Sequence, residues 1–428
     1  MSVGLQRLRD DADTIRNGAI AKREDPKLVD RAIELDAHRR ELLSEHDDKR
    51  HQLKTNSERI GHVMRANPDA GAAELADLRE LLAGLGERIA AIGNELQQTE
   101  SEIDDLLLRI PNPPDPDVPV GGEEASVIVR TWGEPASAEG RKPHWEVAER
   151  LGMFDLAAGA KVTGSGFPIY VGAGSRLQRA LINFFLDLHT SEHGFTEVWP
   201  PALVNEESAR GTGQIPDKED QMYVVTRDDL YLVPTAEVPV TNMLRDEIVE
   251  ADRLPIRYVA YSPCFRREAG AAGAKTRGIL RVHQFDKVEM VCFVKPDESA
   301  ATLEWLTERA EVVLQRLGLA YRVKLMATGD MGFVQAKKYD VEVWAPGVRD
   351  WLEVSSVSNF RDYQARRMNI RWRPEPGAKP EILHTLNGSG LALPRTMAAL
   401  LEVYQQPDGS VALPEPLASR IGPLTVKA

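Results

Sequence analysis

The chain has 428 residues, of which 42% are hydrophobic and 28% are charged, and its formal net charge is −13. One hydrophobic core does not fill that length, so we expect two or three domains. The acidic balance argues against a general nucleic-acid binder, because phosphate contacts require clustered Lys and Arg, and it leaves only a local basic surface for such a partner.

The sequence also argues against a membrane, secreted or zinc protein. It contains no run of about 20 apolar residues, and its first residues, MSVGLQRLRDDADTIRNG, include no apolar segment of a secretory signal. There are only two cysteines, Cys264 and Cys292, they do not form a CxxC, and no histidine pair has metal-ligand spacing, which argues against a disulfide framework and a structural zinc site. We therefore expect a cytoplasmic protein without a membrane span.

Residues 75–110 carry the clearest periodic pattern in the chain. Apolar side chains alternate spacings of three and four, which predicts the seam of a coiled-coil helix. The helix must end before the prolines of residues 111–119, which lack amide donors. The seam consists of Leu75, Leu78, Leu82, Leu85, Ile89, Ile92, Leu96, Thr99, Ile103, Leu106 and Ile110.

The preceding segment supplies a partner helix. Asp25-Pro26 marks its start, and Leu28, Leu35 and Leu42 recur every seven residues. The seam positions Arg39, His46 and Lys49 are weaker, and Leu53 and Ile60 resume the pattern. With a turn predicted at residues 67–71, the two helices form an antiparallel hairpin over about residues 27–110, with arms of ~50 Å.

The first helix of this hairpin is rich in basic side chains. A solvated charged face or a dimerisation zipper explains them as well as a polyanion-binding surface does, so we leave these alternatives open at this point. The basic residues are Lys27, Arg31, Arg39, Arg40, Lys49, Arg50, Lys54, Arg59 and Arg65.

A Pro-rich linker at residues 111–124 separates a first domain, residues 1–110, from a second at residues 125–428. In the second domain, helical patterns at 175–194, 298–318 and 395–406 are interspersed with many strand-like runs. Consecutive strands without an intervening helix predict an α+β fold, an antiparallel sheet flanked by helices. The expected strands are residues 195–204, 229–238, 257–268, 279–293, 337–346 and 350–360.

Three of these strands carry charges at alternate positions, which places the charges on one face of each strand. Cross-strand ion pairs on a solvated face would explain any single pair. The whole set is better explained by a floor that binds a polyanion with a ring system, covered by a loop at residues 269–278. The shared faces are Arg266 with Glu268, Arg281 with His283, Phe285, Lys287 and Glu289, and Thr235 with Glu237.

Such a floor suits a nucleoside triphosphate beside an amino acid. Arginine grips phosphate with a planar fork, a phenyl ring stacks on a base, and carboxylates hold Mg²⁺ or an ammonium group. The chain has no GxxxxGK[ST] motif, and GSGF at 164–167 and GAGS at 172–175 are more typical of turns.

These residues resemble the motifs of class II aminoacyl-tRNA synthetases. Phe265-Arg266-Arg267-Glu268 followed by Arg281 is similar to motif 2, residues 387–396 to motif 3, and HGFTEVWPPALV with Pro200-Pro201 to motif 1. The segments PTAEVPVTN, TRGILRVHQFDKVEM, SSVSNFRDYQARR and LLEVYQQPDG are similar to those of seryl-tRNA synthetases. The hairpin also resembles their tRNA-binding arm, so the resemblance covers essentially the whole chain.

The resemblance implies a role for each matching residue. The catalytic residues would be Arg266, Arg281 and Arg395. The ATP-binding residues would be Arg266, Arg267, Glu268, Val282, Phe285, Glu353, Val354, Ser355, Ser356 and Arg395. Serine would be bound by Thr235, Ala236, Glu237, Glu289 and Ser389, and Mg²⁺ by Glu353 and Ser356.

Two features of these assignments can be checked against a structure. Glu353 and Ser356 are three residues apart, so they face the same side of a strand only if a β-bulge lies between them. Pro394, where the family commonly has Gly, stands at the expected start of a helix, a position that tolerates proline. Structural roles are expected for His283 and His384, because the implied chemistry requires no histidine.

The implied reaction is ATP-dependent formation of seryl-adenylate and transfer of the seryl group to the 3′ end of tRNA(Ser), with tRNA(Sec) left open. The implied assembly is a homodimer through the motif 1 region at Pro201. Two alternatives are a synthetase-like ligase that loads an amino acid onto a carrier protein, and a non-catalytic tRNA-binding paralogue.

Overall fold

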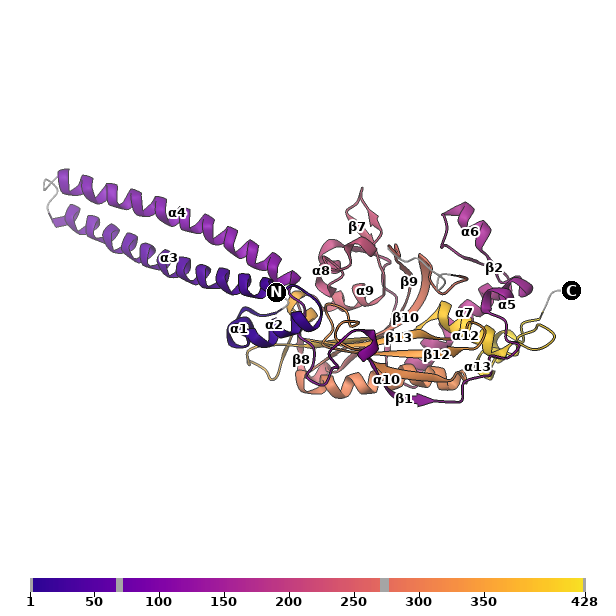
Figure 1. Ribbon diagram of the computed structural model, residues 1–428. Helices are drawn as coiled ribbons and strands as arrows, with labels where there is room; N and C mark the ends of the chain where they lie inside the picture. Colours follow the sequence, from indigo (N-terminus) through magenta and orange to yellow (C-terminus); the bar gives the residue numbers. More distant parts are fainter. Residues whose placement is uncertain (1–2, 67–71, 270–276, 426–428) are drawn as a thin grey trace. The chain divides into compact units, whose positions relative to one another are not determined.

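The computed structural model describes residues 3–66, 72–269 and 277–425, which form two compact units (Figure 1). Unit 1 contains Val3–Ile20 and Glu24–Ile110, and unit 2 contains Ala21–Arg23 and Pro111–Ala428. The boundary between them lies at the Ile110–Pro111 bond, where the prolines begin. Among the described residues, every helix is too short or too polar to cross a membrane.

Unit 1 is a helical hairpin with two short helices before it. The helices are α1 (Leu5–Asp10), α2 (Ala12–Ala21), α3 (Lys27–Ala66) and α4 (Ala72–Arg109). Helices α3 and α4 are the paired indigo and purple rods of Figure 1. The Asp25 carboxylate accepts a hydrogen bond of 2.9 Å from the amide of Lys27, so α3 begins one residue after Pro26. The turn predicted at residues 67–71 lies outside the described residues.

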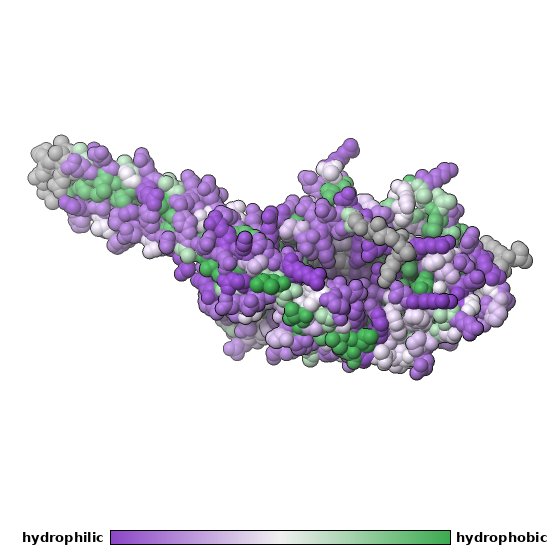
Figure 2. Space-filling view, viewed as in Figure 1, coloured by the Kyte–Doolittle hydropathy of each residue, from purple (hydrophilic) through white to green (hydrophobic). Residues whose placement is uncertain are grey.

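The predicted seam of α4 is buried or half-buried as far as Ile103, with Leu75, Leu82 and Ile89 half-buried, and one correction follows it. Leu78, Leu85, Ile92 and Ile103 are at most 7% exposed. At the end of α4, Leu107 is fully buried and the predicted Leu106 is only half-buried. The reason is that a straight helix turns once per 3.6 residues, so a strict 3.5-residue pattern drifts by a position over several turns. Figure 2 shows hydrophobic residues along the hairpin between hydrophilic surfaces.

The packing of α3 differs along its length. Val29, Leu35 and Leu42 are buried, whereas Leu28 is half-buried, and all side chains between residues 43 and 65 are half-buried or exposed. Ion pairs join the two helices: Arg31 to Glu102 at 2.9 Å and Arg88 to Glu45 at 2.7 Å. Some basic side chains of α3 therefore stabilise the hairpin itself.

Unit 2 is built on an eight-stranded sheet with the order β1-β11-β12-β13-β16-β10-β9-β4. All neighbours are antiparallel except β4 and β9, which confirms the predicted α+β class. Its strands are β1 (Val127–Trp132), β4 (Thr196–Val198), β9 (Ile256–Phe265), β10 (Gln284–Val294), β11 (Tyr321–Leu325), β12 (Lys337–Ala345), β13 (Asp350–Arg361) and β16 (His384–Ala392).

Helices and small sheets surround this sheet. The helices are α5 (His144–Leu151), α6 (Leu156–Val162), α7 (Ala173–Ser191), α8 (Glu206–Thr212), α9 (Glu237–Thr241), α10 (Ser299–Arg316), α11 (Tyr363–Arg367), α12 (Leu393–Tyr404) and α13 (Glu415–Ile421). The small strands are β2 (Phe154–Asp155), β3 (Ile169–Tyr170), β5 (Leu203–Asn205), β6 (Val224–Val225), β7 (Leu230–Leu232), β8 (Ile248–Glu250), β14 (Arg371–Arg373) and β15 (Glu381–Ile382).

Four predicted strands are wrong in part, and one of them, residues 257–268, ends at Phe265 as β9. Residues 195–204 form two short strands, β4 and β5, that belong to different sheets. The segment 229–238 is a strand only at β7, and α9 begins at Glu237. Residues 279–283 form turns, because β9 ends at Phe265 and offers no strand against which an earlier start of β10 could pair. The predicted helices correspond to α7, α10 and α12, and Pro394 lies in the first turn of α12.

The sheet has one apolar face, on which α7, α10 and α12 pack. Alternate residues of the central strands enter this core, among them Val288, Met290 and Cys292 of β10. The opposite face carries the polar residues and, further along, a second apolar cluster with Val291 and Phe293. The alternation of each strand therefore sorts core side chains from those available to bind a ligand.

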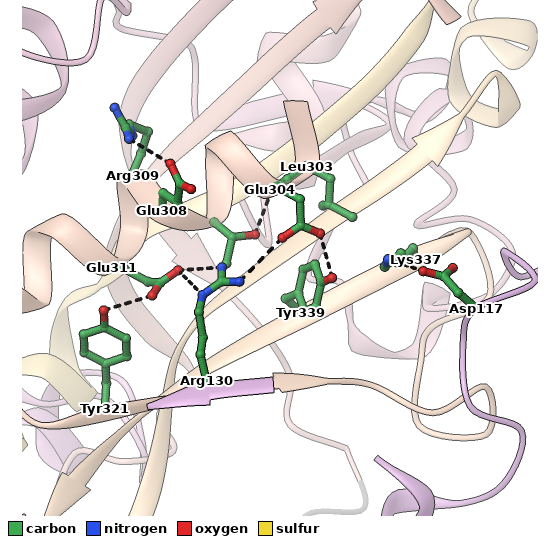
Figure 3. Close-up of polar contacts among 11 residues, drawn as sticks. Asp117, Arg130, Leu303, Glu304, Glu308, Arg309, Glu311, Tyr321, Lys337 and Tyr339 are labelled. Carbon is green, nitrogen blue, oxygen red and sulfur yellow. Dashed lines mark hydrogen bonds and ion pairs between the residues drawn. The ribbon is translucent and has the colours of Figure 1, made fainter. Parts of the chain in front are cut away.

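The start of unit 2 is fastened to the sheet by polar contacts (Figure 3). Arg130 of β1 bonds Glu311 at 2.6 Å and lies 3.5 Å from Glu304, and these two carboxylates also accept from the hydroxyls of Tyr321 and Tyr339. In the segment predicted as a linker, the Asn112 side-chain amide donates to the carbonyls of Val334 and Phe360 at 3.0 and 2.8 Å. The segment is therefore packed on unit 2 rather than a free tether.

Candidate active site

A cavity of about 540 Å³ opens on the polar face of the sheet. Strands β10, β13 and β16 supply its floor, Arg266 reaches it from just after β9, and the segments around the start of α9 and at the start of α12 supply side chains at its edges. Fourteen of the predicted site residues line it: Thr235, Glu237, Arg266, Glu268, Arg281, Val282, Phe285, Glu289, Glu353, Val354, Ser355, Ser356, Ser389 and Arg395.

Two predicted site residues lie outside the cavity lining. Arg267 is exposed, and its guanidinium donates to the carbonyl of Asp220 at 3.0 Å. It points away because its neighbours Arg266 and Glu268 point inward. Ala236 is fully buried in the second apolar cluster, so its side chain packs in that cluster.

The alternation predicted for β10 is confirmed from Phe285 onward. Phe285, Lys287 and Glu289 all line the cavity. Arg281 reaches it from a turn rather than from the strand. The predicted place of His283 is wrong: its ring stacks on Phe167, with ring centroids 5.3 Å apart, and its Nδ1 lies 3.0 Å from the Tyr223 hydroxyl.

The bulge that the assignments of Glu353 and Ser356 require is present in β13. Val341 of β12 pairs with Ser355 and the next residue, Glu342, pairs with Glu353, so Val354 is an extra residue in β13. The bulge changes which face successive residues point to. Glu353 and Ser356 consequently both line the cavity, while Val357 remains in the apolar core.

One part of the cavity is a buried polar network around Glu289, which is 1% exposed. Its carboxylate accepts from Lys287 Nζ at 2.5 Å, Asn387 Nδ2 at 3.0 Å and Ser389 Oγ at 3.2 Å. Lys287 Nζ also donates to Thr235 Oγ1 at 2.8 Å. Lys287 and Asn387 had no predicted role, although alternation places Lys287 beside Glu289 and Asn387 beside Ser389.

Glu237 is a second buried carboxylate in the cavity wall, 6% exposed. Burial and the nearby Glu289 charge raise its pKa to about 7, against the hydrogen bond from Gln364 and the Lys287 charge. The Gln364 amide donates to Glu237 Oε1 at 2.7 Å. Near neutral pH this carboxyl therefore exchanges a proton readily.

Guanidiniums gather in the other part of the cavity. The Arg266 guanidinium lies 5.1 Å from the centre of the Phe285 ring, and Arg281 lies 3.4 Å from the Glu268 carboxylate. Arg395 donates to the Glu353 carbonyl at 2.8 Å, and its side chain lies 3.5 Å from the Glu353 carboxylate. Cationic groups thus rest on an aromatic face or on carboxylates.

Two carboxyl groups near these arginines, Glu353 and Asp340, have opposite pKa shifts. Burial raises the pKa of Glu353, but Arg395, Lys338 and Arg266 outweigh it, so the net shift is downward. In the neighbouring Asp340, burial raises the pKa to about 7 in spite of Lys338, whose ammonium lies 3.2 Å away. Glu353 is therefore the carboxylate that stays ionised beside the arginines.

Comparison with known proteins decides the family. A seryl-tRNA synthetase N-terminal domain model matches residues 4–114, and a class II tRNA synthetase core domain model (G, H, P, S and T) matches residues 223–404. The serine--tRNA ligase of Thermomicrobium roseum is 51% identical over 98% of this chain and 93% of its own length; that of Gemmatimonas aurantiaca is 49% identical over 98% of both.

The chain belongs to the seryl-tRNA synthetase family. The crystal structure of the seryl-tRNA synthetase from Pyrococcus horikoshii, complexed with ATP, superposes with a TM-score of 0.93 at 38% identity and covers 99% of this chain and 100% of its own. As a serine--tRNA ligase, the chain activates serine and charges tRNA(Ser). The relatives support neither of the two alternative functions.

The raised pKa of Glu237 predicts a pH-dependent stability. Its folded pKa of about 7 exceeds the ordinary value of 4.5, so the folded state loses stability as pH rises from below 4.5 to above 7. Glu237→Gln removes this ionisation and should raise the free energy of unfolding by about 2 kcal/mol more at pH 8 than at pH 5. Denaturant unfolding at the two pH values measures the difference.

The exposed Glu381→Gln serves as the control and should shift stability equally at both pH values. If Glu237→Gln raised the free energy of unfolding equally at pH 5 and pH 8, the raised pKa of Glu237 would be contradicted.

Proposed function

We propose that this cavity binds ATP and serine side by side and joins them as seryl-adenylate. The observation that carries the proposal is the division of one cavity into an arginine and phenyl part and a buried carboxylate and hydroxyl part. Phe285 and Glu289 lie four residues apart on β10, about 13 Å along the strand. That separation suits a base at one end and an amino acid at the other.

The arginine part is assigned to ATP. Arg266 would hold the α-phosphate with Glu268 beside the nucleotide, and Arg281 would hold the terminal phosphates. The adenine would stack between Phe285 and Arg395. Val282, Val354 and Ser355 would complete the walls. The ATP in the P. horikoshii relative and the AMP in the Naegleria fowleri enzyme, which is 28% identical with a TM-score of 0.86, support a nucleotide site in this fold.

Mg²⁺ fits the donors near Glu353. The bulge turns the Glu353 carboxylate and the Ser356 hydroxyl toward the same cavity, and hard oxygen donors with few protein ligands are typical of Mg²⁺ bound together with phosphates. Arg395 and Lys338 keep Glu353 ionised, as a metal ligand must be. When bound, Mg²⁺ would neutralise phosphate charge.

The carboxylate part is assigned to serine. Thr235, Glu237, Glu289 and Ser389 would form the pocket, with Lys287 and Asn387 holding Glu289 in position. A buried site that hydrogen-bonds a hydroxyl rejects alanine and glycine, because its polar groups would be left unpaired. Threonine would be excluded by its extra methyl group.

The chemistry requires positioning more than a protein nucleophile. The serine carboxylate attacks the α-phosphorus in line, the new oxygen–phosphorus bond forms, and pyrophosphate leaves with the electrons of the broken bond. The 3′-hydroxyl of the terminal adenosine of tRNA then attacks the seryl carbonyl and AMP leaves. The arginines stabilise the charge that develops on the phosphates.

The serine pocket is tested by Glu289→Ala. Because Glu289 is the centre of the buried network, the substitution should lower serine-dependent pyrophosphate exchange by roughly 10²-fold or more. ATP affinity, measured by calorimetry without serine, should stay close to that of the wild type, since the nucleotide part is left intact.

Arg267→Ala is the matched control on motif 2. Its side chain points out of the cavity, so it should retain both ATP binding and exchange. Equal losses of ATP binding and serine activation in Glu289→Ala would mean that Glu289 is misassigned.

The hairpin of unit 1 is assigned to tRNA(Ser). Arg31 and Arg88 are engaged in ion pairs between the helices, but Arg50, Lys54 and Arg65 in the later half of α3 are exposed to solvent. Basic side chains along a helix can follow phosphates without reading bases. Charging of tRNA(Sec) and residence in the cytoplasm stay predictions.

Replacing Arg50, Lys54 and Arg65 together by Ala should raise the KM for tRNA in the charging reaction on the order of tenfold, because phosphate contacts and their released counterions are lost. Serine-dependent pyrophosphate exchange without tRNA should not change. A control with Lys161, Arg227 and Lys379 replaced by Ala has the same net charge. An unchanged KM for tRNA in the first variant would leave the hairpin a structural role only.

The motif 1 region is assigned to a homodimer. A groove of about 450 Å³ is lined by Val198, Pro201 and Pro239, among others. Trp199 and Met243 also line it, and they are 76% and 45% exposed, an unusual exposure for such apolar side chains. A second copy packed on this surface would bury them.

Trp199→Glu should therefore weaken self-association, measured by sedimentation velocity over a range of concentrations. Val120→Glu, at an equally exposed position in the linker, is the control and should leave it unchanged. A wild-type protein that sediments as a monomer at all concentrations would overturn the dimer.

A further inference from the structure

A buried histidine–glutamate pair lies outside the cavity. His144, the first residue of α5, and Glu402, near the end of α12, are both 0% exposed. Glu402 Oε1 accepts from the backbone amide and the Nδ1 of His144, each at 2.9 Å. Its Oε2 accepts from the amides of Gly347 and Val348 at 2.8 and 3.1 Å. Four donors satisfy one carboxylate, which explains how a charged group is held there.

The carboxylate determines the tautomer of His144. An ionised carboxylate only accepts, so His144 Nδ1 carries the proton and Nε2 is left as an acceptor. The amide of Ile279 donates to that Nε2 at 3.4 Å. His144 therefore connects Glu402 of the motif 3 helix to the backbone that follows the motif 2 loop.

Three consecutive residues on this backbone contact the start of α5. The Arg277 guanidinium lies 4.8 Å from the centre of the Trp145 ring. Gly278 has φ +74°, and a Cβ there would come within 2.3 Å of His144 Nε2, so only glycine allows the close approach. Ile279 supplies the hydrogen bond described above.

The next three residues, Leu280, Arg281 and Val282, line the cavity. The Leu280 carbonyl also accepts from Arg395 Nε at 3.3 Å. The contacts at 277–279 thus fix the backbone immediately before Arg281, the residue assigned to the terminal phosphates of ATP. Glu402 and Arg395 belong to the same helix, so α12 contacts this segment at two adjacent residues, at Ile279 through His144 and at Leu280 through Arg395.

We propose that His144 and Glu402 are positioning residues for ATP, which act through the amide of Ile279 to hold residues 277–282 in the shape that the nucleotide requires. The inference rests on the nucleotide site proposed above. A backbone that these contacts hold in shape loses less freedom when ATP binds. Neither side chain contacts the serine pocket, so serine binding does not depend on the pair.

Two substitutions of His144 separate its two hydrogen bonds. In His144→Asn, the side-chain amide can occupy the place of Nδ1 and keep the bond to Glu402, but it is too short to reach Ile279. In His144→Gln, the longer side chain brings a carbonyl oxygen to the place of Nε2, where it can accept from Ile279. Serine-dependent pyrophosphate exchange of the full chain gives the KM for ATP and for serine separately.

The Asn variant should raise the KM for ATP about fivefold to tenfold, the effect of one lost hydrogen bond, and leave the KM for serine unchanged. The Gln variant should recover most of the wild-type KM for ATP. Trp145→Leu removes the contact with Arg277 at a half-buried position and leaves Glu402 untouched. It should raise the KM for ATP and leave the KM for serine unchanged. This variant keeps the proposal testable if the His144 variants fail to fold.

An unchanged KM for ATP in both His144→Asn and Trp145→Leu would overturn the proposal. The proposal would also be overturned if the variants lost thermal stability and kcat while both KM values stayed unchanged. It would be overturned too if His144→Asn and His144→Gln had the same KM for ATP, because the pair would then have only a structural role. A wild-type chain that shows no exchange with serine would instead refute the proposed function, so the two failures are distinguishable.

Discussion

The alternation of side chains across three adjacent strands, β13, β16 and β10, is the constraint on which the rest of the structure depends. One face must be apolar to pack on α7, α10 and α12, and the other is therefore free to be polar. The bulge at Val354 allows β13 to satisfy both demands. A regular strand with Glu353 in the cavity would turn Ser356 into the core and Val357 into the cavity.

A cavity rich in charge must also be stable without its ligands. Here three cationic groups have partners within the site: Lys287 is paired with Glu289, Arg281 is paired with Glu268, and Arg266 lies over the ring of Phe285. Substrate binding then exchanges these internal partners for phosphates and for the groups of serine, which limits the desolvation cost of an unpaired charge. For Glu237, burial and the nearby charge of Glu289 raise the pKa.

Periodicity in the sequence predicts the hairpin, the sheet class and the inward face of β10, because each depends on spacing along one element, whereas the bulge is required only by the roles that the family resemblance implies for Glu353 and Ser356. Periodicity fails where an element depends on a neighbour: residues 279–283 have strand-like alternation but no strand to pair with. Pro234 and Pro239 flank Glu237 and were a signal against a strand there. His144 and Glu402 are 258 residues apart, and no pattern in the sequence relates them.

Pyrophosphate exchange into ATP by the full chain, measured across a panel of single amino acids, tests most directly whether this sheet face joins a nucleotide to serine. The account predicts exchange with serine and none above background with alanine, glycine or threonine. Exchange with a different amino acid in place of serine, or with none of the panel, would contradict it.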